Sequence, residues 1–277
     1  MLRRFLLIAL LATANVTAAD QQPGRLAFSA TLESIKINAR PDDVVTRQFR
    51  LTLEPNQPRT TFRAHVDDWW RTPDGAQSVY AAPGTLRHSC ATWTSVNPVD
   101  ATVSAGETLV VRVSVKVPHE VTPSGFWCAL TVDEVPDPMA QNAGVGVKFL
   151  ASVSTGIFVY VGDVSRKASI VDLSADASNV RVRVRNDGNA PLGIDGRIEF
   201  YAAGTTVPAA TVTLPRATVL TEPTVEGVMT APLPSSIKLP SGRYRMRAIL
   251  DFGTDHYIGA EREAVITRPV ASAGRDR

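Results

Sequence analysis

The stretch Gly144–Gly162, GVGVKFLASVSTGIFVYVG, alternates between apolar residues and small or polar ones over most of its length. Its odd positions are apolar at nearly every step from Val145 to Val161. A period of two places one apolar face on a β-strand. The run is roughly three times the usual strand length and would extend about 55 Å, more than one sandwich core needs. We therefore expect this strand either to kink at Gly156 or to leave part of its length for a partner.

Apolar alternation of the same kind recurs along the chain, and turn sequences such as Pro73-Asp74-Gly75 separate the runs. Many short strands with such turns are typical of β-sandwiches of the immunoglobulin kind. The fold class predicted is all-β, with two tandem immunoglobulin-like β-sandwiches. The predicted strands are Leu26–Ile37, Arg47–Leu53, Phe62–Trp70, Gln77–Tyr80, Thr92–Val96, Leu109–Val117, Phe126–Val132, Val145–Val161, Ala168–Leu173, Asn179–Asn186, Gly196–Tyr201, Ala210–Leu214, Thr224–Thr230, Gly242–Asp251 and Arg262–Ile266.

The chain begins with the pattern of a secretory signal. A basic start is followed by a short apolar core, Phe5–Ala14, and by small residues suited to cleavage after residue 19. No later segment reaches the roughly 18 apolar residues of a membrane span. We expect residues 1–19 to be a cleaved signal peptide, 20–163 and 164–267 to be two domains, and 268–277 to be a disordered tail. The expected location is the periplasm.

Charge and cysteine content narrow the function classes. The chain has 29 basic and 27 acidic residues, and two of the basic ones, Arg3 and Arg4, lie in the signal. A charge near zero argues against sequence-independent binding of nucleic acid or anionic lipid. The two cysteines, Cys90 and Cys128, are more readily explained as a disulfide than as metal ligands, because the expected compartment is oxidising. Two unpaired buried thiols are the alternative.

Residues that could carry out catalysis are scarce. No pair of the four histidines has the spacing of metal ligands, and His65 falls on a predicted strand, where we assign it a structural role. The segment Asp67-Asp68-Trp69-Trp70 suggests sugar chemistry, but neighbouring strand residues point to opposite faces, so the two carboxylates cannot easily share a site. We interpret its tryptophans as core residues of a sandwich. The prediction is a protein that is not an enzyme and has no cofactor or metal.

The export signal, the two sandwich-like halves and the long alternating strand before their junction together resemble the periplasmic pilus-assembly chaperones, the PapD-like family. The segment Ser104–Thr108, followed by Leu109–Pro118, also resembles that family's glycine turn, strand and terminal proline. The resemblance implies a long strand lent to an incomplete pilin subunit. It implies that Val147, Phe149, Ala151 and Val153 form the partner-binding strand, with a pilin-like client and an outer-membrane usher as partners.

The same resemblance implies a second site. The family holds the client's C-terminal carboxylate with two basic residues, one on the first strand and one on the long strand. Arg25 or Lys36 would supply the first of these charges, whereas the long-strand position falls on Phe158, which cannot do so.

Two functions follow. The leading hypothesis is a periplasmic chaperone-like protein that assists assembly of fimbrial or other surface-appendage subunits by edge-strand complementation. Its alternative is that the whole long run is an internal strand with both edges paired. The second hypothesis is an exported structural or adhesive protein that binds a surface ligand through Trp69, Trp70 or Trp93.

Overall fold

The computed structural model describes residues 27–30, 33–136, 150–233, 236–237 and 239–267. The described part is almost entirely β, so the predicted fold class is confirmed. The strands of the first half are β1 (Phe28–Ala30), β2 (Ile35–Ala39), β3 (Val44–Leu53), β4 (Thr60–Arg71), β5 (Ser78–Ala81), β6 (Thr94–Asn97), β7 (Asp100–Val103), β8 (Thr108–Lys116), β9 (Ser124–Glu134) and β10 (Ser152–Val161), with a 3-10 turn at η1 (Ala91–Trp93). Those of the second half are β11 (Ala168–Ala175), β12 (Asn179–Asn186), β13 (Leu192–Tyr201), β14 (Ala210–Val219), β15 (Glu226–Pro232), β16 (Gly242–Asp251) and β17 (Ile258–Ile266).

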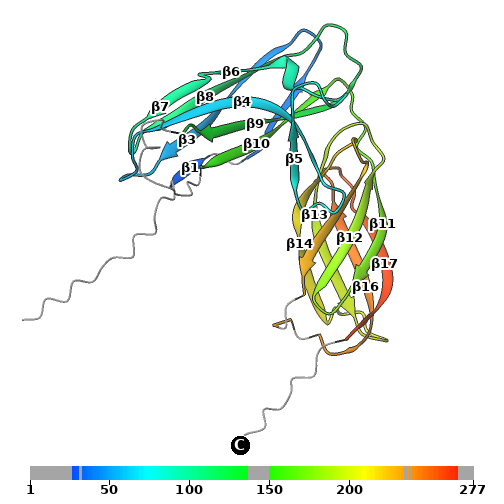
Figure 1. Cartoon of the computed structure of the whole chain (residues 1–277). Coiled ribbons are helices and arrows are strands. Elements are labelled where there is room, and N and C mark those ends of the chain that lie inside the picture. The colour runs from blue at the N-terminus through cyan, green and yellow to red at the C-terminus, as the bar shows by residue number, and fades with distance from the viewer. Residues whose placement is uncertain (1–26, 31–32, 137–149, 234–235, 238, 268–277) are drawn as a thin grey trace, which may run out of the picture.

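Each half is a sandwich of two sheets. In the first sandwich, one sheet has the strand order β1-β3-β8-β6 and the facing sheet has the order β2-β10-β9-β4-β5. In the second of these sheets, β7 also pairs with β4. In the second sandwich, β11-β12-β15 faces β14-β13-β16-β17. The two sandwiches are set at an angle to each other, so that the molecule is bent (Figure 1). The chain passes from one to the other between β10 and β11.

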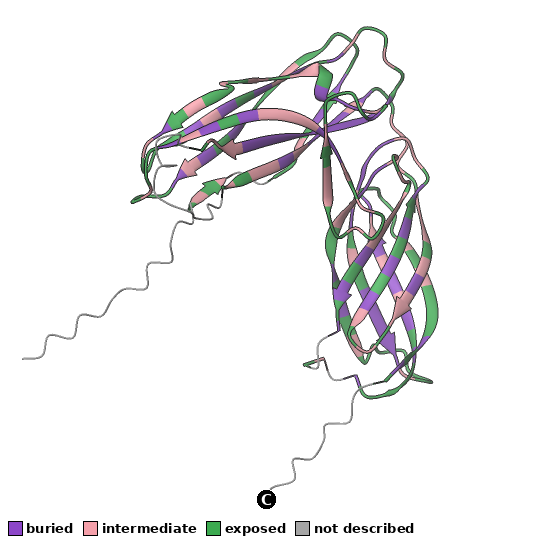
Figure 2. Ribbon diagram, in the orientation of Figure 1, coloured by how far each residue is buried: buried purple, intermediate pink, exposed green. Residues whose placement is uncertain are grey.

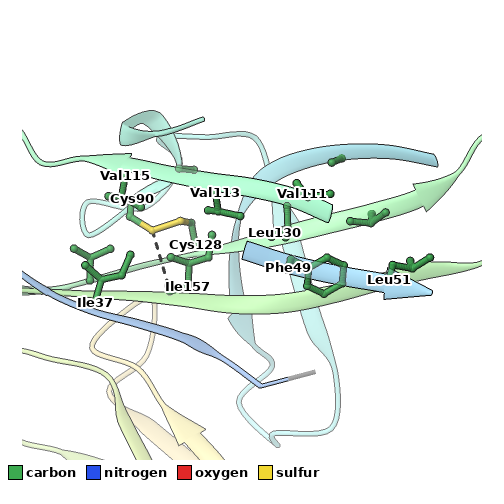
Figure 3. Close-up of a cluster of buried hydrophobic side chains, with 14 of the residues drawn as sticks. Ile37, Phe49, Leu51, Cys90, Val111, Val113, Val115, Cys128, Leu130 and Ile157 are labelled. Atoms are coloured by element: carbon green, nitrogen blue, oxygen red, sulfur yellow. Dashed lines mark hydrogen bonds between the residues drawn. A yellow bond between two sulfur atoms is a disulfide. The ribbon is translucent and has the colours of Figure 1, made fainter. Parts of the chain in front are cut away.

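Each sandwich has its own apolar core. Along β8 and β12, buried valines alternate with exposed residues, as a strand with one dry and one wet face requires (Figure 2). In the first core, Leu51 on β3 and Val113 on β8 lie across from Ile157 on β10 and are shielded completely from solvent (Figure 3). The disulfide Cys90–Cys128 lies in this same core and confirms the predicted bridge (Figure 3).

Three strand predictions need correction. The run 26–37 was expected as one strand, but β1 pairs with β3 in one sheet whereas β2 pairs with β10 in the other. The long strand begins at Ser152 within the described residues, and its pairing with β9 passes Gly156 without a shift of register, so no β-bulge occurs there. The short strand β7 was missed. Residues 1–19, 145–149 and 268–277, on which other predictions fall, lie outside the described residues.

Polar contacts fix the junction between the two sandwiches. The Gly125 N–H of β9 donates to the Asn189 carbonyl of the second sandwich at 2.9 Å. The carboxylate of Glu222, also from the second sandwich, accepts from the backbone N–H of His88 at 2.6 Å and from the guanidinium of Arg87 at 3.4 Å. The Glu222 side chain is only 11% exposed, so these contacts are partly shielded from water. The junction therefore holds the two sandwiches in a defined relative position.

Candidate partner-binding site

The two ends of β10 have different surroundings. β9 pairs with the whole of β10 in antiparallel register, whereas β2 pairs in parallel with Ile157–Val161 only. Among the described residues, no strand lies on that second side of Ser152–Gly156, but the Thr155 hydroxyl donates to the carbonyl of Glu33, just before β2, at 3.0 Å, and Thr155 is buried. We call Ser152–Ser154 the free edge and Ile157–Val161 the paired half.

The direction of the backbone groups along the free edge follows from one bond. The Ala151 carbonyl accepts from the Glu134 N–H at 2.8 Å, so the backbone N–H and C=O groups of residue 151 point to β9. By alternation, those of residues 153 and 155 do the same. At the other end of the strand, the Gly162 N–H donates to the carbonyl of Ala39, the last residue of β2, at 3.2 Å, so the backbone groups of the even positions face the β2 side. The N–H and C=O groups of Ser152 and Ser154 therefore point to the side where the free edge lacks a strand.

The predicted partner-binding residues divide into two pairs. Val147 and Phe149 lie outside the described residues. Ala151 is half-buried just before β10, and Val153 is half-buried against the core of its own sandwich. The neighbouring Leu150 is 46% exposed. What the free edge offers a partner is thus its backbone, and the donor role of the four side chains stays a prediction.

A polar network holds the free edge against the sheet. The Ser152 hydroxyl donates to Asp133 on β9 at 2.5 Å. The ring of His65 lies between two carboxylates, with Nε2 at 2.8 Å from Asp133 and Nδ1 at 2.9 Å from Asp67. This is the structural role predicted for His65. Asp68 points to the opposite face, as expected from the strand geometry, and is fully buried.

Aromatic side chains gather where β10 approaches the junction. Trp69 and Phe158 meet edge to face with ring centroids 6.1 Å apart, and both are nearly buried. They form a cluster with Trp127 of β9 and Leu220 of the second sandwich. The Trp69 indole N–H donates to the Cys128 carbonyl at 3.1 Å. Trp69 is therefore structural as predicted, but it packs at the junction rather than inside a sandwich core.

Three cations surround a cavity beside this cluster. The cavity has a volume of about 610 Å³, and Trp69 and Phe158 are among the residues that line it. Lys36 on β2, Arg71 at the end of β4 and Arg216 on β14 also line it. Within the described part of the chain, none of the three cations has a carboxylate at ion-pair distance.

Lys36 lies directly opposite Phe158 in the β2–β10 register, which joins the cations to the paired half of the strand. The family resemblance implies Arg25 or Lys36 as a carboxylate ligand, and of these only Lys36 lies within the described residues. Arg71 and Arg216 were not predicted, because they come from distant strands and only the fold brings them to one cavity. With charges from three strands and a single lining carboxylate, Glu33, the cavity suits an anionic group.

The same two arginines separate this cavity from a second one of about 500 Å³, which lies between the turn after β4 and the strands β14 and β15. Asp74 lines that second cavity. Hydrogen bonds from the Thr72 hydroxyl and the Ala76 N–H hold the pKa of Asp74 below its ordinary value, so it stays ionised near neutral pH. Glu222 and Glu226 also line the second cavity, so it has three lining carboxylates, whereas the first has only Glu33.

Comparisons with known proteins find similarity only among solved structures. No family model matches the chain, and no curated protein matches it by sequence. Solved structures do resemble it: the class 5 fimbriae chaperone CfaA (11% identity, TM-score 0.46, 86% of this chain and 99% of that one) and the CupB2 chaperone of Pseudomonas aeruginosa (14%, 0.42, 84% and 99%). A third is the Salmonella enterica SafB chaperone in complex with the SafA pilin (11%, 0.43, 85% and 96%). The chain resembles the PapD-like fimbrial chaperones. At these values the likeness is one of fold alone.

The tryptophans of the adhesive hypothesis do not form a common surface. Trp69 is nearly buried in the junction cluster. Trp93 packs on Phe126 with ring centroids 4.5 Å apart, and Trp70 lines the second cavity. Within the described residues, no cluster of three or more acidic, histidine or cysteine side chains has the arrangement of a metal site, and no helix is long and apolar enough to cross a membrane.

Proposed function

We propose that the protein is a periplasmic chaperone-like protein that binds an exported client by adding a client strand to the free edge. The observation that carries the proposal is that Ser152 and Ser154 direct backbone N–H and C=O groups to a side with no strand among the described residues. Exposed edges of this kind pair readily with another chain, and natural proteins usually block them. An edge that no described strand covers therefore supports a role in binding.

The proposed client is a pilin-like subunit of a fimbrial or related appendage, and an outer-membrane usher is the further partner proposed. In this proposal the client strand continues the sheet beyond β10. Ala151 and Val153, together with Val147 and Phe149, would lend apolar side chains to the client. Lys36, Arg71 and Arg216 would hold the client's terminal carboxylate in the cavity. No catalytic step is proposed, and residues 20–163 and 164–267 are proposed as the two domains.

The experiment that tests the proposal separates the backbone from the side chain at one position. A photoreactive residue at Leu150, next to the free edge, is used to crosslink partners in the periplasm, and the adduct is identified by mass spectrometry. We compare Ser154→Ala, which keeps the backbone N–H, with Ser154→Pro, which removes it and blocks a partner strand. The proposal expects an adduct to a small exported β-rich protein that survives in Ser154→Ala and disappears in Ser154→Pro.

Two results would contradict the proposal. One is an adduct of equal yield in both variants, since a partner that pairs with the backbone must be sensitive to proline. The other is an adduct that forms only within the chain itself, which would mean that the free edge is covered by another part of the protein. Circular dichroism of each variant verifies that the fold is kept.

A further inference from the structure

The two residues of the free edge whose backbone points outward are tied to β9 by their side chains. The Ser152 hydroxyl donates to Oδ1 of Asp133 at 2.5 Å, and the Ser154 hydroxyl lies 3.0 Å from the hydroxyl of Thr131. Because the N–H and C=O groups of both serines point away from β9, the side chains supply the bonds between these residues and β9. A strand that is already held in an extended shape loses less conformational freedom when a partner pairs with it. These ties therefore prepare the free edge for a partner strand.

The two ties differ in charge. Ser154 and Thr131 join two neutral hydroxyls, whereas Ser152 bonds to a carboxylate, and hydrogen bonds to ionised groups are roughly twice as strong as neutral ones. The other oxygen of Asp133, Oδ2, lies 2.8 Å from Nε2 of His65. His65 therefore reaches the free edge through Asp133, although β9 separates its own strand, β4, from β10.

The ring of His65 has a carboxylate at each nitrogen. Nε2 faces Asp133, and Nδ1 lies 2.9 Å from Oδ2 of Asp67. A carboxylate is ionised near neutral pH and only accepts hydrogen bonds, so each contact requires an N–H on the ring. Of the forms of imidazole, only the protonated one has two N–H groups. The arrangement around His65 is therefore complete only when the ring carries a positive charge.

The other groups that face His65 keep their charge between pH 5.5 and pH 8. Arg63 is opposite Asp133 in the β4–β9 register, pairs with Asp100 of β7 at 2.8 Å and stays protonated throughout this range. Thr131, directly opposite His65, and the two serines of the free edge are uncharged. Among the described residues of this face, the imidazole is thus the group whose charge changes in this range.

Loss of the ring proton leaves one N–H for two carboxylates. Asp67 is the more buried of them, with 21% of its side chain exposed, against 41% for Asp133. Water replaces a hydrogen bond more readily at an exposed group, and a more buried group costs more when it is left unpaired. The remaining N–H therefore stays on Nδ1, toward Asp67. The lone pair of Nε2 then faces the Asp133 carboxylate and repels it.

We propose that His65 is a positioning residue of the free edge and that its protonation strengthens the pairing of a partner strand. In the protonated form, His65 holds Asp133, and Asp133 holds Ser152 in line for pairing. In the neutral form, the Asp133 carboxylate turns toward water and its bond to Ser152 weakens. The inference rests on the proposed function, in that the partner strand pairs with the free edge, and it adds that this pairing is regulated by pH.

Nitrogen-15 NMR spectra of the imidazole rings test the proton positions without a partner. At pH 5.5 both nitrogens of His65 should have the shifts of an imidazolium, and at pH 8 the ring should be the Nδ1–H tautomer. A His65→Gln variant assigns the signals. Backbone order parameters should fall at Ser152 between pH 5.5 and pH 8 and stay unchanged at Ser154. An Nε2–H tautomer at pH 8, or an unchanged order parameter at Ser152, would overturn the inference.

The pairing itself is measured through the crosslinked adduct. A photoreactive residue at Leu150 is activated in periplasmic extract at pH 5.5 and at pH 8, below saturation. We expect about fivefold more adduct at pH 5.5, the change that corresponds to one hydrogen bond. Ser152→Ala should give the lower yield at both pH values, whereas the matched control Ser154→Ala should keep the wild-type ratio. A pH response of the client itself is common to both serine variants, so it does not affect this comparison.

Substitutions of the ring separate its charge from its shape. His65→Gln, which is neutral at both pH values, should abolish the difference between them. His65→Arg should keep the higher yield at pH 8, because arginine stays charged and has several N–H groups. His256→Gln, at an exposed histidine of the second sandwich, is the control and should keep the wild-type ratio. Circular dichroism verifies the fold of each variant. A wild-type ratio in His65→Gln would overturn the inference.

Failure of the inference and failure of the proposed function give different results. If no adduct that is sensitive to Ser154→Pro forms at either pH, the proposed function fails and the inference fails with it. If such an adduct forms but Ser152→Ala keeps the wild-type pH ratio, only the inference fails.

Discussion

The free edge and the paired half of β10 belong to one strand and share one neighbour, β9, but they differ in what lies on the other side. β2 covers Ile157–Val161, and the side chains of Ile157 and Val159 are fully buried. Ser152–Ser154 has no such cover among the described residues, and Val153 is only half-buried. The difference follows from where β2 begins, at Ile35, because β1 pairs with β3 in the other sheet and does not extend β2 along β10. One strand can thus support a core at one end and present a backbone for binding at the other.

The largest expected effect is a difference in stability loss between substitutions in the paired half and at the free edge. Ile157→Ala in the paired half should lower the free energy of unfolding by about 2–5 kcal/mol, because it leaves a cavity in the core. Val153→Ala at the free edge should cost about 1 kcal/mol, since less apolar surface is buried there. Urea denaturation measures both. Equal losses would show that the free edge is as deeply packed as the paired half.

The disulfide sharpens the same comparison. Cys128 pairs with Ile157 in the β9–β10 register, so the bridge lies beneath the paired half. Replacing both cysteines, Cys90→Ala with Cys128→Ala, should cost about 2–4 kcal/mol, because a closed loop no longer limits the unfolded chain. Hydrogen exchange should accelerate at the bonded amides of the paired half. Faster exchange at Ser152 and Ser154 alone would contradict the comparison.

Proline substitutions test whether the N–H groups of neighbouring residues at the free edge point to opposite sides of β10. Ser154→Pro should cost at most about 1 kcal/mol, since its N–H points away from β9 and the ladder loses no bond. Val153→Pro should cost clearly more, because the N–H of residue 153 faces Val132 on β9. Thermal unfolding compares the two variants. The opposite order would mean that the backbone directions are reversed.

The smallest effect concerns the turn after β2, the strand that distinguishes the two halves. His119 Nδ1 lies 2.7 Å from Asp42, and this hydrogen bond raises the pKa of His119 above its ordinary value. The stabilisation is fully present below the unfolded-state pKa of about 6.5 and is lost as the pH rises through the raised pKa of the folded state. Both groups are exposed, so the gain is small.

Asp42→Asn should return the His119 pKa toward its ordinary value in an NMR titration. It should also lower the melting temperature more at pH 5.5 than at pH 8. A melting temperature that falls equally at both values would show that the Asp42 charge does not act through His119.

Features that depend on a local sequence pattern could be predicted from the sequence alone. Alternation identified most strands and the all-β class, and the expected compartment together with the even cysteine count predicted the Cys90–Cys128 bridge, which the structure confirms. Alternation could not show that residues 28–30 and 35–39 enter different sheets, because both runs are equally apolar on one face. The short β7 lacks a pattern long enough to be distinguished from a loop.

The residues around the cavity were still harder to predict from the sequence, because they are far apart along the chain. Lys36 was named from the family resemblance, but nothing in the sequence relates it to Arg71 or Arg216, which are brought to one cavity by two sheets and the junction between the sandwiches. The sequence predicted a possible kink at Gly156. In the structure, the Phe158 ring packs so closely against Gly156 that a Cβ there would be 2.9 Å from Phe158 Cε2. The role of a glycine in close packing depends on neighbours that only the fold supplies.

The contacts of Glu222 and Asn189 at the junction have a consequence for the length of chain that a client must present. Arg216 belongs to the second sandwich and the free edge to the first, so these contacts fix how far Arg216 lies from Ser152. In the proposed complex, a client terminus placed in the cavity that Arg216 lines leaves only one choice of which client residue faces each position of the free edge. The junction would then set the register of the client strand. Removing the Glu222 contacts would let client strands bind shifted by one or two residues.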